Sequence, residues 1–541
     1  MEKIAVQTEN LSFRYPLAVK NSLTDVSFSV KSGEFTVLCG VTGSGKSTLL
    51  KLLKSELSPS GEVSGNIFID GRSINTFREG ESAHLVGYVG QSPGHQSVTD
   101  TVSRELAFGL ENLGMPQAAM HRRIAEVVAF FGLQSIFGSK ISELSGGQKQ
   151  LVNLAAVTAM APKILLLDEP TAQLDPIAAR EFISAVAKLN RETGITVIMA
   201  DHQLEDSVSV CSSMLVLRNG SVLVYNSPAE VAALLADEPE NIMLPAASRV
   251  FFAVGGSGKC PVSVGEGRAY LENNFSFRAG IADTSVCKPA ETAALEFNKV
   301  WFRYSRKSAD VLRDASFTVY CGEAFFILGG NGCGKTTALG AAAGIREPYS
   351  GEVRVFGKKI REYKNGSLYN NCLAYLPQDV ESTFLCDTLG EELGEAKSIF
   401  LSFGMSESLF DVHPYDLSGG EKQLAALAKI LFKKPRLILL DEPTKGVDAC
   451  GVERVAAVID KLKADGAAVV CVTHDAEFAA RCADRCTMFF NGGAVGTAPV
   501  REFFCENTFY TTAVRRMTSG IFENAITVKD VSALFRKGDC P

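Results

Sequence analysis

The sequence predicts an α/β fold with a mainly parallel sheet that is built twice along the chain. Three kinds of segment occur twice in the same order. They are a glycine-rich loop between a short apolar strand and a helix, a Leu-Ser-Gly-Gly segment before a helix, and an apolar run that ends in Asp-Glu-Pro. The intervals match as well, since Ser145 lies 23 residues before Asp168 and Ser418 lies 23 residues before Asp441. Self-similarity at matched intervals indicates a repeated structural unit, so we predict a tandem duplication.

The two copies set the expected domain boundaries. We expect a first domain over residues 1–235, a linker over 236–290, and a second domain with a C-terminal extension over 291–541. The linker stretch contains Gly, Ser and Ala without sustained periodicity, which is typical of a connection. Its segment GGSGKC imitates a phosphate loop, but Ala253 replaces the first glycine of that motif and Cys260 replaces its Ser or Thr. We interpret this segment as a decoy.

Composition and charge limit the classes of function. The chain has 541 residues, 46% of them hydrophobic, and a net charge of −7, which does not favour bulk nucleic-acid binding. No apolar run of about 18 residues predicts a membrane span, and the N-terminal residues lack the pattern of a secretory signal. The 14 cysteines form no C-x-x-C pair, so the usual zinc-ribbon and iron–sulfur spacings are missing. We expect a cytoplasmic location.

Each copy carries the phosphate-loop motif G-x-x-x-x-G-K-[ST] after a short apolar strand, FTVLC or AFFIL. Its glycines let backbone N–H groups converge on phosphate oxygens, its lysine neutralises β/γ-phosphate charge, and its Ser or Thr hydroxyl binds Mg²⁺. The predicted ATP-binding residues are Gly40, Val41, Thr42, Gly43, Ser44, Gly45, Lys46, Ser47 and Thr48 in the first copy, and Gly329, Gly330, Asn331, Gly332, Cys333, Gly334, Lys335, Thr336 and Thr337 in the second.

Paired carboxylates end the apolar runs ILLLDEP and LILLDEP. These runs predict strands buried on both faces of a parallel sheet, which deliver the acids to the carboxyl edge where ligands bind. We expect Asp168 and Asp441 to complete the Mg²⁺ site together with Ser47 and Thr336. Glu169 and Glu442 are then the candidate general bases that activate water.

The LSGGQ and LSGGE segments give each copy a second anion-binding helix N-terminus. Because each copy already has its own phosphate loop, this surplus site is expected to serve the nucleotide of the other copy. The two copies should therefore close face to face with two ATP molecules between them. In this arrangement Ser145, Gly146, Gly147 and Gln148 cover the ATP on Lys335, and Ser418, Gly419, Gly420 and Glu421 cover the ATP on Lys46.

Three further residue pairs occupy repeated positions. His202 and His474 each follow an apolar strand. A lone histidine there is usually structural, but its repetition favours a contact with the γ-phosphate. The other candidates are Gln91 and Gln378, which would touch Mg²⁺ or the attacking water, and Tyr15 and Tyr304, which would stack on adenine rather than only pack against the strands.

With these motifs in order, both halves resemble ATP-binding-cassette (ABC) ATPases. The resemblance implies two tandem P-loop NTPase domains, each with a RecA-like core, an antiparallel β-subdomain and an α-helical subdomain. It also implies an ATP hydrolase that uses ATP and Mg²⁺, in which ATP binding closes the pair of copies and hydrolysis reopens it. Gln91 lies 54 residues before Ser145, whereas Gln378 lies only 40 before Ser418, so we expect a smaller second helical subdomain.

A narrower resemblance involves residues 91–114, 376–393 and 501–517. These stretches are similar to the ATPases of energy-coupling-factor importers, which take up vitamins, their precursors, or cobalt and nickel ions. That resemblance implies two membrane partners, a transmembrane coupling protein and a small substrate-binding protein, and a peripheral position on the cytoplasmic face of the membrane. Here both ATPases would pair within one chain, with no role for nucleic acid.

Two alternatives remain at this stage. A tandem ABC protein that acts on ribosomes is expected to have a long basic arm between the halves. The linker stretch carries five basic and six acidic residues, which argues against this alternative. An ATPase of a fused sugar-type importer commonly has one degenerate half, whereas both sets of motifs are intact here.

Overall fold

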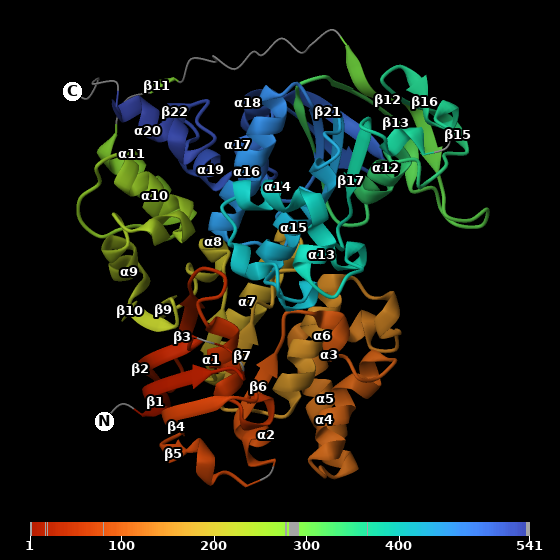
Figure 1. Ribbon diagram of the computed structural model, residues 1–541. Coiled ribbons are helices and arrows are strands. Elements are labelled where there is room, and N and C mark those ends of the chain that lie inside the picture. Colours follow the sequence, from red (N-terminus) through yellow and green to blue (C-terminus); the bar gives the residue numbers. More distant parts are fainter. Residues whose placement is uncertain are drawn as a thin grey trace. The chain divides into compact units, whose positions relative to one another are not determined.

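The computed structural model describes residues 3–16, 18, 20–78, 80–275, 279–280, 292–364 and 366–536 (Figure 1). The chain divides into two compact units, Met1–Arg249 with Ser257–Ser263 and Val250–Gly256 with Val264–Pro541. Each unit contains one of the two predicted copies. Among the described residues, no helix combines the length and the apolar character that a membrane span needs.

The first unit is organised around a six-stranded sheet of order β10-β9-β3-β8-β7-β6. All neighbouring strands are parallel except β10 and β9, which are antiparallel. Every residue of β3, β7 and β8 is buried, as their continuous apolar sequences predict. The carboxyl ends of these three strands therefore meet at one edge. The strands are β3 (Phe35–Cys39), β6 (Val86–Val89), β7 (Ile164–Asp168), β8 (Thr196–Ala200), β9 (Ser213–Arg218) and β10 (Ser221–Asn226).

A smaller antiparallel sheet of order β2-β1-β4-β5 lies beside this core. In β2, Leu23, Val26, Phe28 and Val30 are buried while most intervening residues are exposed, because one face of the strand meets the core and the other meets solvent. Its strands are β1 (Ile4–Arg14), β2 (Leu23–Lys31), β4 (Glu62–Ile69) and β5 (Arg72–Ser73). This sheet is the predicted β-subdomain.

The helices of the first unit include a subdomain in which α4 and α5 both pack against α6. The helix after the phosphate loop is α1 (Lys46–Leu52), and the subdomain consists of α4 (Val102–Asn112), α5 (Gln117–Phe131) and α6 (Gly146–Ala159). The others are α2 (Glu81–Leu85), α3 (Pro93–Gln96), α7 (Pro176–Thr193), α8 (Leu204–Ser207) and α9 (Pro228–Leu234).

The second unit repeats this architecture, as the duplication predicts. Its six-stranded sheet has the order β17-β18-β19-β14-β20-β21 and its antiparallel sheet the order β13-β12-β15-β16. The strands are β12 (Ala293–Phe302), β13 (Leu312–Tyr320), β14 (Ala324–Leu328), β15 (Ser350–Val355), β16 (Lys358–Lys359), β17 (Leu373–Leu376), β18 (Leu437–Asp441), β19 (Ala468–Val472), β20 (Arg485–Phe490) and β21 (Gly493–Pro499).

The helical subdomain is smaller in the second unit, which confirms the expectation from the spacing. Two short helices, α13 (Leu389–Leu393) and α14 (Lys397–Ser402), stand where the first unit has helices of 11 and 15 residues. The remaining helices of this copy are α12 (Lys335–Ala342), α15 (Gly419–Leu431), α16 (Ala449–Ala464) and α17 (Ala476–Cys482).

The stretch predicted as a linker contains two helices, α10 (Ala246–Ala253) and α11 (Val264–Asn274), while residues 276–278 and 281–290 lie outside the described part. The decoy segment GGSGKC begins just after α10 and not after a strand, so it lacks the strand–loop–helix context of a phosphate loop. The C-terminal extension forms α18 (Val500–Glu506), α19 (Ala513–Thr518), β22 (Phe522–Glu523) and α20 (Val528–Arg536).

The C-terminal extension and α11 form one packed group. Helix α11 packs against α19, and β11 (Ala279–Gly280) pairs in parallel with β22. The Phe275 ring contacts Phe522 and Phe535, with ring centroids 5.8 and 5.3 Å away. The segment that precedes the second copy is therefore packed against the C-terminal extension that follows it.

A buried glutamate holds the loop that follows Gln91. The Glu105 carboxylate, 7% exposed, accepts hydrogen bonds from the backbone N–H groups of Val98 (3.1 Å) and Thr99 (2.8 Å) and from the Thr99 hydroxyl (2.8 Å). Because a buried donor left without an acceptor loses its hydration without compensation, this carboxylate fixes the backbone of the loop.

Replacing Glu105 with Gln weakens this cluster, because a neutral amide oxygen accepts less strongly than a carboxylate and its NH₂ group faces donors. We expect Glu105→Gln to lower the free energy of unfolding by about 1–3 kcal/mol, measured by urea denaturation of the full chain. Glu111→Gln on the exposed face of the same helix is the control and should change it by less than about 0.5 kcal/mol. Equal effects of the two substitutions would contradict the assignment.

Candidate functional site

The phosphate loop of the first copy needs its glycines for space and for backbone conformation. Gly40 has φ 149°, and a Cβ there would lie 2.3 Å from the Leu217 carbonyl oxygen. Gly45 has φ 99°, and its Cβ would lie 2.7 Å from the Ser22 carbonyl oxygen. Lys46 is buried, and its Nζ donates a hydrogen bond to the Gly40 carbonyl at 2.8 Å. The loop is thus compact, with its lysine held at its centre.

The second phosphate loop has the same conformation. Gly329 has φ 150° and Gly334 has φ 104°, and a Cβ on Gly329 would meet the Phe489 carbonyl oxygen at 2.4 Å. Lys335 Nζ donates to the carbonyls of Gly329 at 2.8 Å and Gly330 at 2.9 Å. Both predicted phosphate loops are therefore formed alike, each at the carboxyl end of the central strand β3 or β14 and the start of a helix.

The structure brings together the hydroxyl and carboxylate that were predicted to hold Mg²⁺. The Ser47 hydroxyl donates to Asp168 Oδ1 at 2.8 Å, and the Thr336 hydroxyl donates to Asp441 Oδ1 at 3.2 Å. Tyr88 donates to the other oxygen of Asp168 at 2.9 Å. Oxygen atoms of hydroxyl and carboxylate groups suit a hard cation such as Mg²⁺, so the donor set fits the ion in both copies.

The candidate general bases sit on unusual backbone. Glu169 has φ 45° and Glu442 has φ 51°, in the left-handed region that non-glycine residues seldom adopt. His202 Nδ1 lies 3.4 Å from Glu169 Oε2, and His474 Nδ1 lies 3.0 Å from Glu442 Oε1. The predicted histidines therefore contact the predicted bases.

Each histidine is buried, which lowers the pKa of its imidazole, and lies beside a glutamate, which raises that pKa. Burial lowers the pKa of His202, but the hydrogen bond and negative charge of Glu169 outweigh burial and leave its pKa above the ordinary value. The same balance with Glu442 raises the pKa of His474. Protonated imidazole is thereby favoured, and a cation at the edge of the phosphate loop suits a phosphate ligand.

The two glutamine loops differ. Gln91 Nε2 donates to Glu169 Oε2 at 3.1 Å, as expected for a residue that touches the catalytic water. Gln378 is exposed, and within the described part of the chain it forms no hydrogen bond with Glu442 or Asp441. Gln91 therefore contacts its candidate general base and Gln378 does not, while contact of either glutamine with Mg²⁺ or water stays a prediction.

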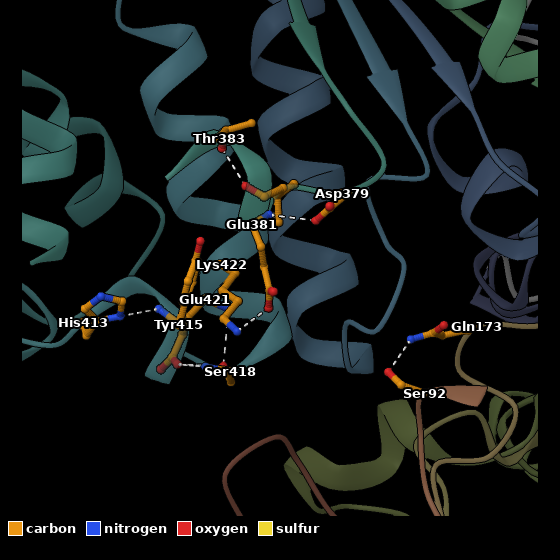
Figure 2. A network of polar contacts seen from close by, with 11 residues as sticks. Ser92, Gln173, Asp379, Glu381, Thr383, His413, Tyr415, Ser418, Glu421 and Lys422 are labelled. Carbon is orange, nitrogen blue, oxygen red and sulfur yellow. Dashed lines mark hydrogen bonds and ion pairs between the residues drawn. The ribbon is translucent and has the colours of Figure 1, made fainter. Parts of the chain in front are cut away.

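The residues after each glutamine also have different partners (Figure 2). In the first unit Gln173, which follows the Asp-Glu-Pro segment, donates to the Ser92 hydroxyl at 3.0 Å. In the second unit Glu381 forms an ion pair of 2.6 Å with Lys422, on the signature helix α15. The first glutamine loop is also hydrogen-bonded to its own signature helix α6. Both loops therefore contact their signature helix, and the first is in addition tied to the catalytic strand end.

The signature segments begin helices α6 and α15 with capping boxes. Ser145 caps α6 by accepting from the Gln148 N–H at 3.3 Å, and the Gln148 side chain accepts from the Ser145 N–H at 3.0 Å. Ser418 and Glu421 do the same for α15, and Glu421 also accepts from the Ser418 hydroxyl at 2.7 Å. Glutamate at this position is therefore a helix cap, which the S-x-x-E spacing could have indicated.

The two candidate adenine-stacking tyrosines lie against the phosphate-loop helices. The hydroxyl of Tyr15 is 3.1 Å from that of Thr48, and the hydroxyl of Tyr304 is 3.1 Å from that of Thr337. The residues are 36% and 57% exposed, so ring surface is available to a ligand. Stacking on adenine stays a prediction.

Sequence reasoning missed Tyr88 and its counterpart Tyr375. Burial, followed by the negative charge of Asp168, raises the pKa of Tyr88, and burial followed by Asp441 raises that of Tyr375. Both phenols therefore stay protonated, and Tyr88 donates to Asp168. The signal was present, since VGYVG and LAYLP place a tyrosine at the same strand position.

Comparison with known proteins decides the family. The model of the ABC transporter family matches residues 23–172 and 312–445, one match in each copy. The chain belongs to the ABC transporter family. It is 38% identical over 545 residues to a Bacillus cereus protein named "Putative ABC transporter ATP-binding protein", with 98% of each chain covered.

Other similar proteins cover most of the chain or a little under half of it. A Bacillus subtilis protein named "Putative HMP/thiamine import ATP-binding protein YkoD" is 30% identical over 519 residues, with 92% of each chain covered. A solved structure of cbiO1 from Clostridium perfringens, part of the ABC transporter complex cbiONQ, is 30% identical and covers 45% of this chain and 98% of its own, with a TM-score of 0.40.

Membership of this family gives the coarse function. The chain is the ATP-binding subunit of an ABC transporter and hydrolyses ATP, and its two ABC domains bind the nucleotide. The predicted tandem fold is confirmed by the two family matches and by the repeated pair of sheets.

The buried Asp441 gives a test of this geometry. Burial raises its pKa from 3.8 to about 6. Since the folded state holds this proton more tightly than the unfolded state, the charged carboxylate destabilises the nucleotide-free protein above pH 6, and the destabilisation fades as the pH falls towards 3.8.

Asp441→Asn should therefore stabilise the nucleotide-free chain by up to about 3 kcal/mol at pH 7.5 and by about half as much at pH 5. Scanning calorimetry at both pH values measures the shift in Tm. Asp465→Asn, at an exposed helix end, is the matched control and should show no such trend. A gain that is equal at the two pH values would contradict the buried charge.

Proposed function

We propose that this ABC subunit energises an importer of the energy-coupling-factor type, which takes up a vitamin, a vitamin precursor or a transition-metal ion. The observation that carries this proposal is an apolar side chain presented at the same place in each glutamine loop. Val98 is 65% exposed and Leu385 is 88% exposed. A single exposed apolar side chain is common on protein surfaces, but one repeated at the same position of both glutamine loops favours contact with a partner.

Hydrogen bonds to buried glutamates fix the backbone that carries both side chains. Glu105 binds the Val98 N–H, and Glu392 accepts from the N–H groups of Leu385 (2.7 Å) and Cys386 (2.8 Å). Lys429 of α15 forms an ion pair with Glu392, so the second loop is also linked to the signature helix. A displacement of either loop is thereby transmitted to its ATPase domain. Coupling to a transmembrane protein requires such a connection.

The class of substrate is supported by sequence likeness. The stretches 91–114 and 376–393 include both loops and resemble the ATPases of energy-coupling-factor importers. The Bacillus subtilis relative, similar over 92% of the chain, carries HMP/thiamine import in its name. On this proposal the chain lies on the cytoplasmic face of the membrane, bound to a coupling protein and a small substrate-binding membrane protein.

The proposed chemistry uses two nucleotides in one chain. Each ATP lies on one phosphate loop and is covered by the signature helix of the other copy, so Ser145 completes the site of Lys335 and Ser418 that of Lys46. Closure is favoured because the two domains are joined, which raises their effective concentration. Mg²⁺, when bound, neutralises β/γ-phosphate charge. Its proposed protein ligands are Ser47, Asp168 and Gln91 in one site and Thr336, Asp441 and Gln378 in the other.

Within each proposed site the residues have separate tasks. Glu169 and Glu442 accept the proton of the attacking water. His202 and His474, whose pKa values these carboxylates raise, contact the γ-phosphate. Gln91 orients the water through its contact with Glu169.

Removing the general bases tests the two-site chemistry. The double variant Glu169→Gln with Glu442→Gln is expected to lower ATP turnover about 10²–10⁴-fold, because the amides cannot take the proton. Each single variant should lose the turnover of its own site, while ATP affinity is retained. Turnover is measured as phosphate release, and affinity with a fluorescent ATP analogue. Glu181→Gln, on the exposed face of α7, is the control. If one of the two variants keeps full turnover, hydrolysis at two sites is wrong.

Capture from membranes tests the partner. The tagged full chain, purified from detergent-solubilised membranes, should bring down a multi-span coupling protein and a small membrane subunit. Val98→Asp with Leu385→Asp should abolish this capture, because a charge at each contact cannot be buried. Leu234→Asp, at a leucine that is 61% exposed in α9, should not affect it. Recovery of ribosomes without a membrane protein would overturn the importer, as would capture that the double variant leaves intact.

A further inference from the structure

In each unit the histidine loop is bonded to the helix that follows the ABC domain. Glu477 lies in the first turn of α17 and accepts a hydrogen bond of 2.6 Å from the backbone N–H of Ala513, the first residue of α19. In the first unit Glu205 of α8 accepts one of 2.9 Å from the N–H of Ala246, the first residue of α10.

This hydrogen bond occurs in both units, although the segments that supply its N–H group differ. Each glutamate lies three residues after the histidine of its own copy, but the bonded N–H lies 44 residues after His202 and 39 after His474. The local sequences LPAAS and TTAVR also differ. Two segments of different length and sequence thus end in the same bond, which is more than the duplication of the motifs requires.

The glutamate is rigidly connected to the histidine. His474 stands between the buried strand β19 and α17, with Thr473 and Asp475 on either side. The Asp475 side chain caps α17 by accepting from the Phe478 N–H at 3.0 Å, and its own N–H donates to the Thr473 hydroxyl at 3.0 Å. These two hydrogen bonds fix the conformation of the turn. The position of Glu477 therefore determines the position of the His474 ring, whose Nδ1 is 3.0 Å from Glu442.

The segment that supplies the N–H is firmly seated on the second unit. Val514 and Met517 are fully buried, and the Thr512 hydroxyl caps α19 by accepting from the Arg515 N–H at 3.0 Å. The same segment passes beside the phosphate loop, since a Cβ on Gly330 would lie 3.6 Å from the hydroxyl of Tyr510. The C-terminal extension therefore touches two of the loops that form the nucleotide site.

We propose that Glu477 and Glu205 are positioning residues, through which the segment after each ABC domain holds the histidine against its general base. The bond is charge-assisted and part-buried, so it fixes distance as well as direction. A displacement of α19 or α10 would withdraw the histidine and slow hydrolysis at that site. The inference rests on the ATP hydrolysis of the chain and not on the identity of its membrane partner.

Variants on both sides of the bond test this inference in the full chain. Glu477→Ala removes the acceptor, and Ala513→Pro removes the donor at a first helical position, where proline is otherwise tolerated. Each is expected to lower kcat for ATP about three- to tenfold, while KM changes less than about twofold, because coupled residues of this kind modulate a distant step modestly. Combining the two should lower kcat no further than either alone.

Three further variants separate positioning from mere folding and extend the test to the first copy. Glu477→Gln keeps an oxygen that can accept the bond and should recover at least half of the lost kcat. Glu502→Ala, exposed in α18, is the control and should leave kcat unchanged. Glu205→Ala is expected to show the same split between kcat and KM as Glu477→Ala.

All assays are run well below the Tm of every variant, so that a loss of fold is not read as a loss of rate. The inference is overturned if Glu477→Ala lowers Tm but not kcat, if its effect falls on KM alone, or if glutamine recovers nothing. These outcomes leave membrane capture untouched, so failure here is distinguishable from failure of the importer proposal.

Discussion

The burial of a carboxylate at the end of a fully buried strand is the constraint on which each half of the chain depends. Strands β7 and β18 have no exposed residue and end in Asp168 and Asp441, whose pKa values burial raises. Such a charge destabilises the sheet unless donors or a cation meet it. The phosphate-loop hydroxyl supplies a donor in each half, and Tyr88 supplies a second one to Asp168. The remaining negative charge at this edge suits a hard cation such as Mg²⁺.

The glutamate that follows each buried aspartate has a strained backbone conformation. Glu169 and Glu442 follow the buried aspartates with φ 45° and 51°, a conformation that costs about 1–3 kcal/mol. The reversed backbone turns these side chains away from the strand direction and towards the histidines. Their carboxylates then raise the pKa of imidazoles that burial alone would discharge. Two adjacent acids thus serve different tasks because the backbone between them bends.

Sequence alone predicted the duplicated fold and the residues that belong to motifs, since local spacing fixes where a strand ends and a helix starts. It did not predict contacts between residues that are far apart and carry no motif, such as Glu105 with Val98 or Glu477 with Ala513. Composition also favoured a plain linker, but α11 forms there because it packs against α19. Tertiary burial can stabilise a helix whose own sequence is not periodic.

The contacts that sequence could not predict are those that make the two sites different. Gln91 contacts its general base, and its loop is bonded to Gln173 beside the catalytic strand end. Both glutamine loops are also bonded to their own signature helix, the first through Gln150 and Asn153 and the second through Lys422. If each signature helix covers the nucleotide of the other copy, a force on either loop reaches the ATP of the other copy, and a force on the first loop also reaches its own ATP through the general base. Two intact sets of motifs then do not make two equivalent sites, because among the described residues only the first glutamine contacts its general base.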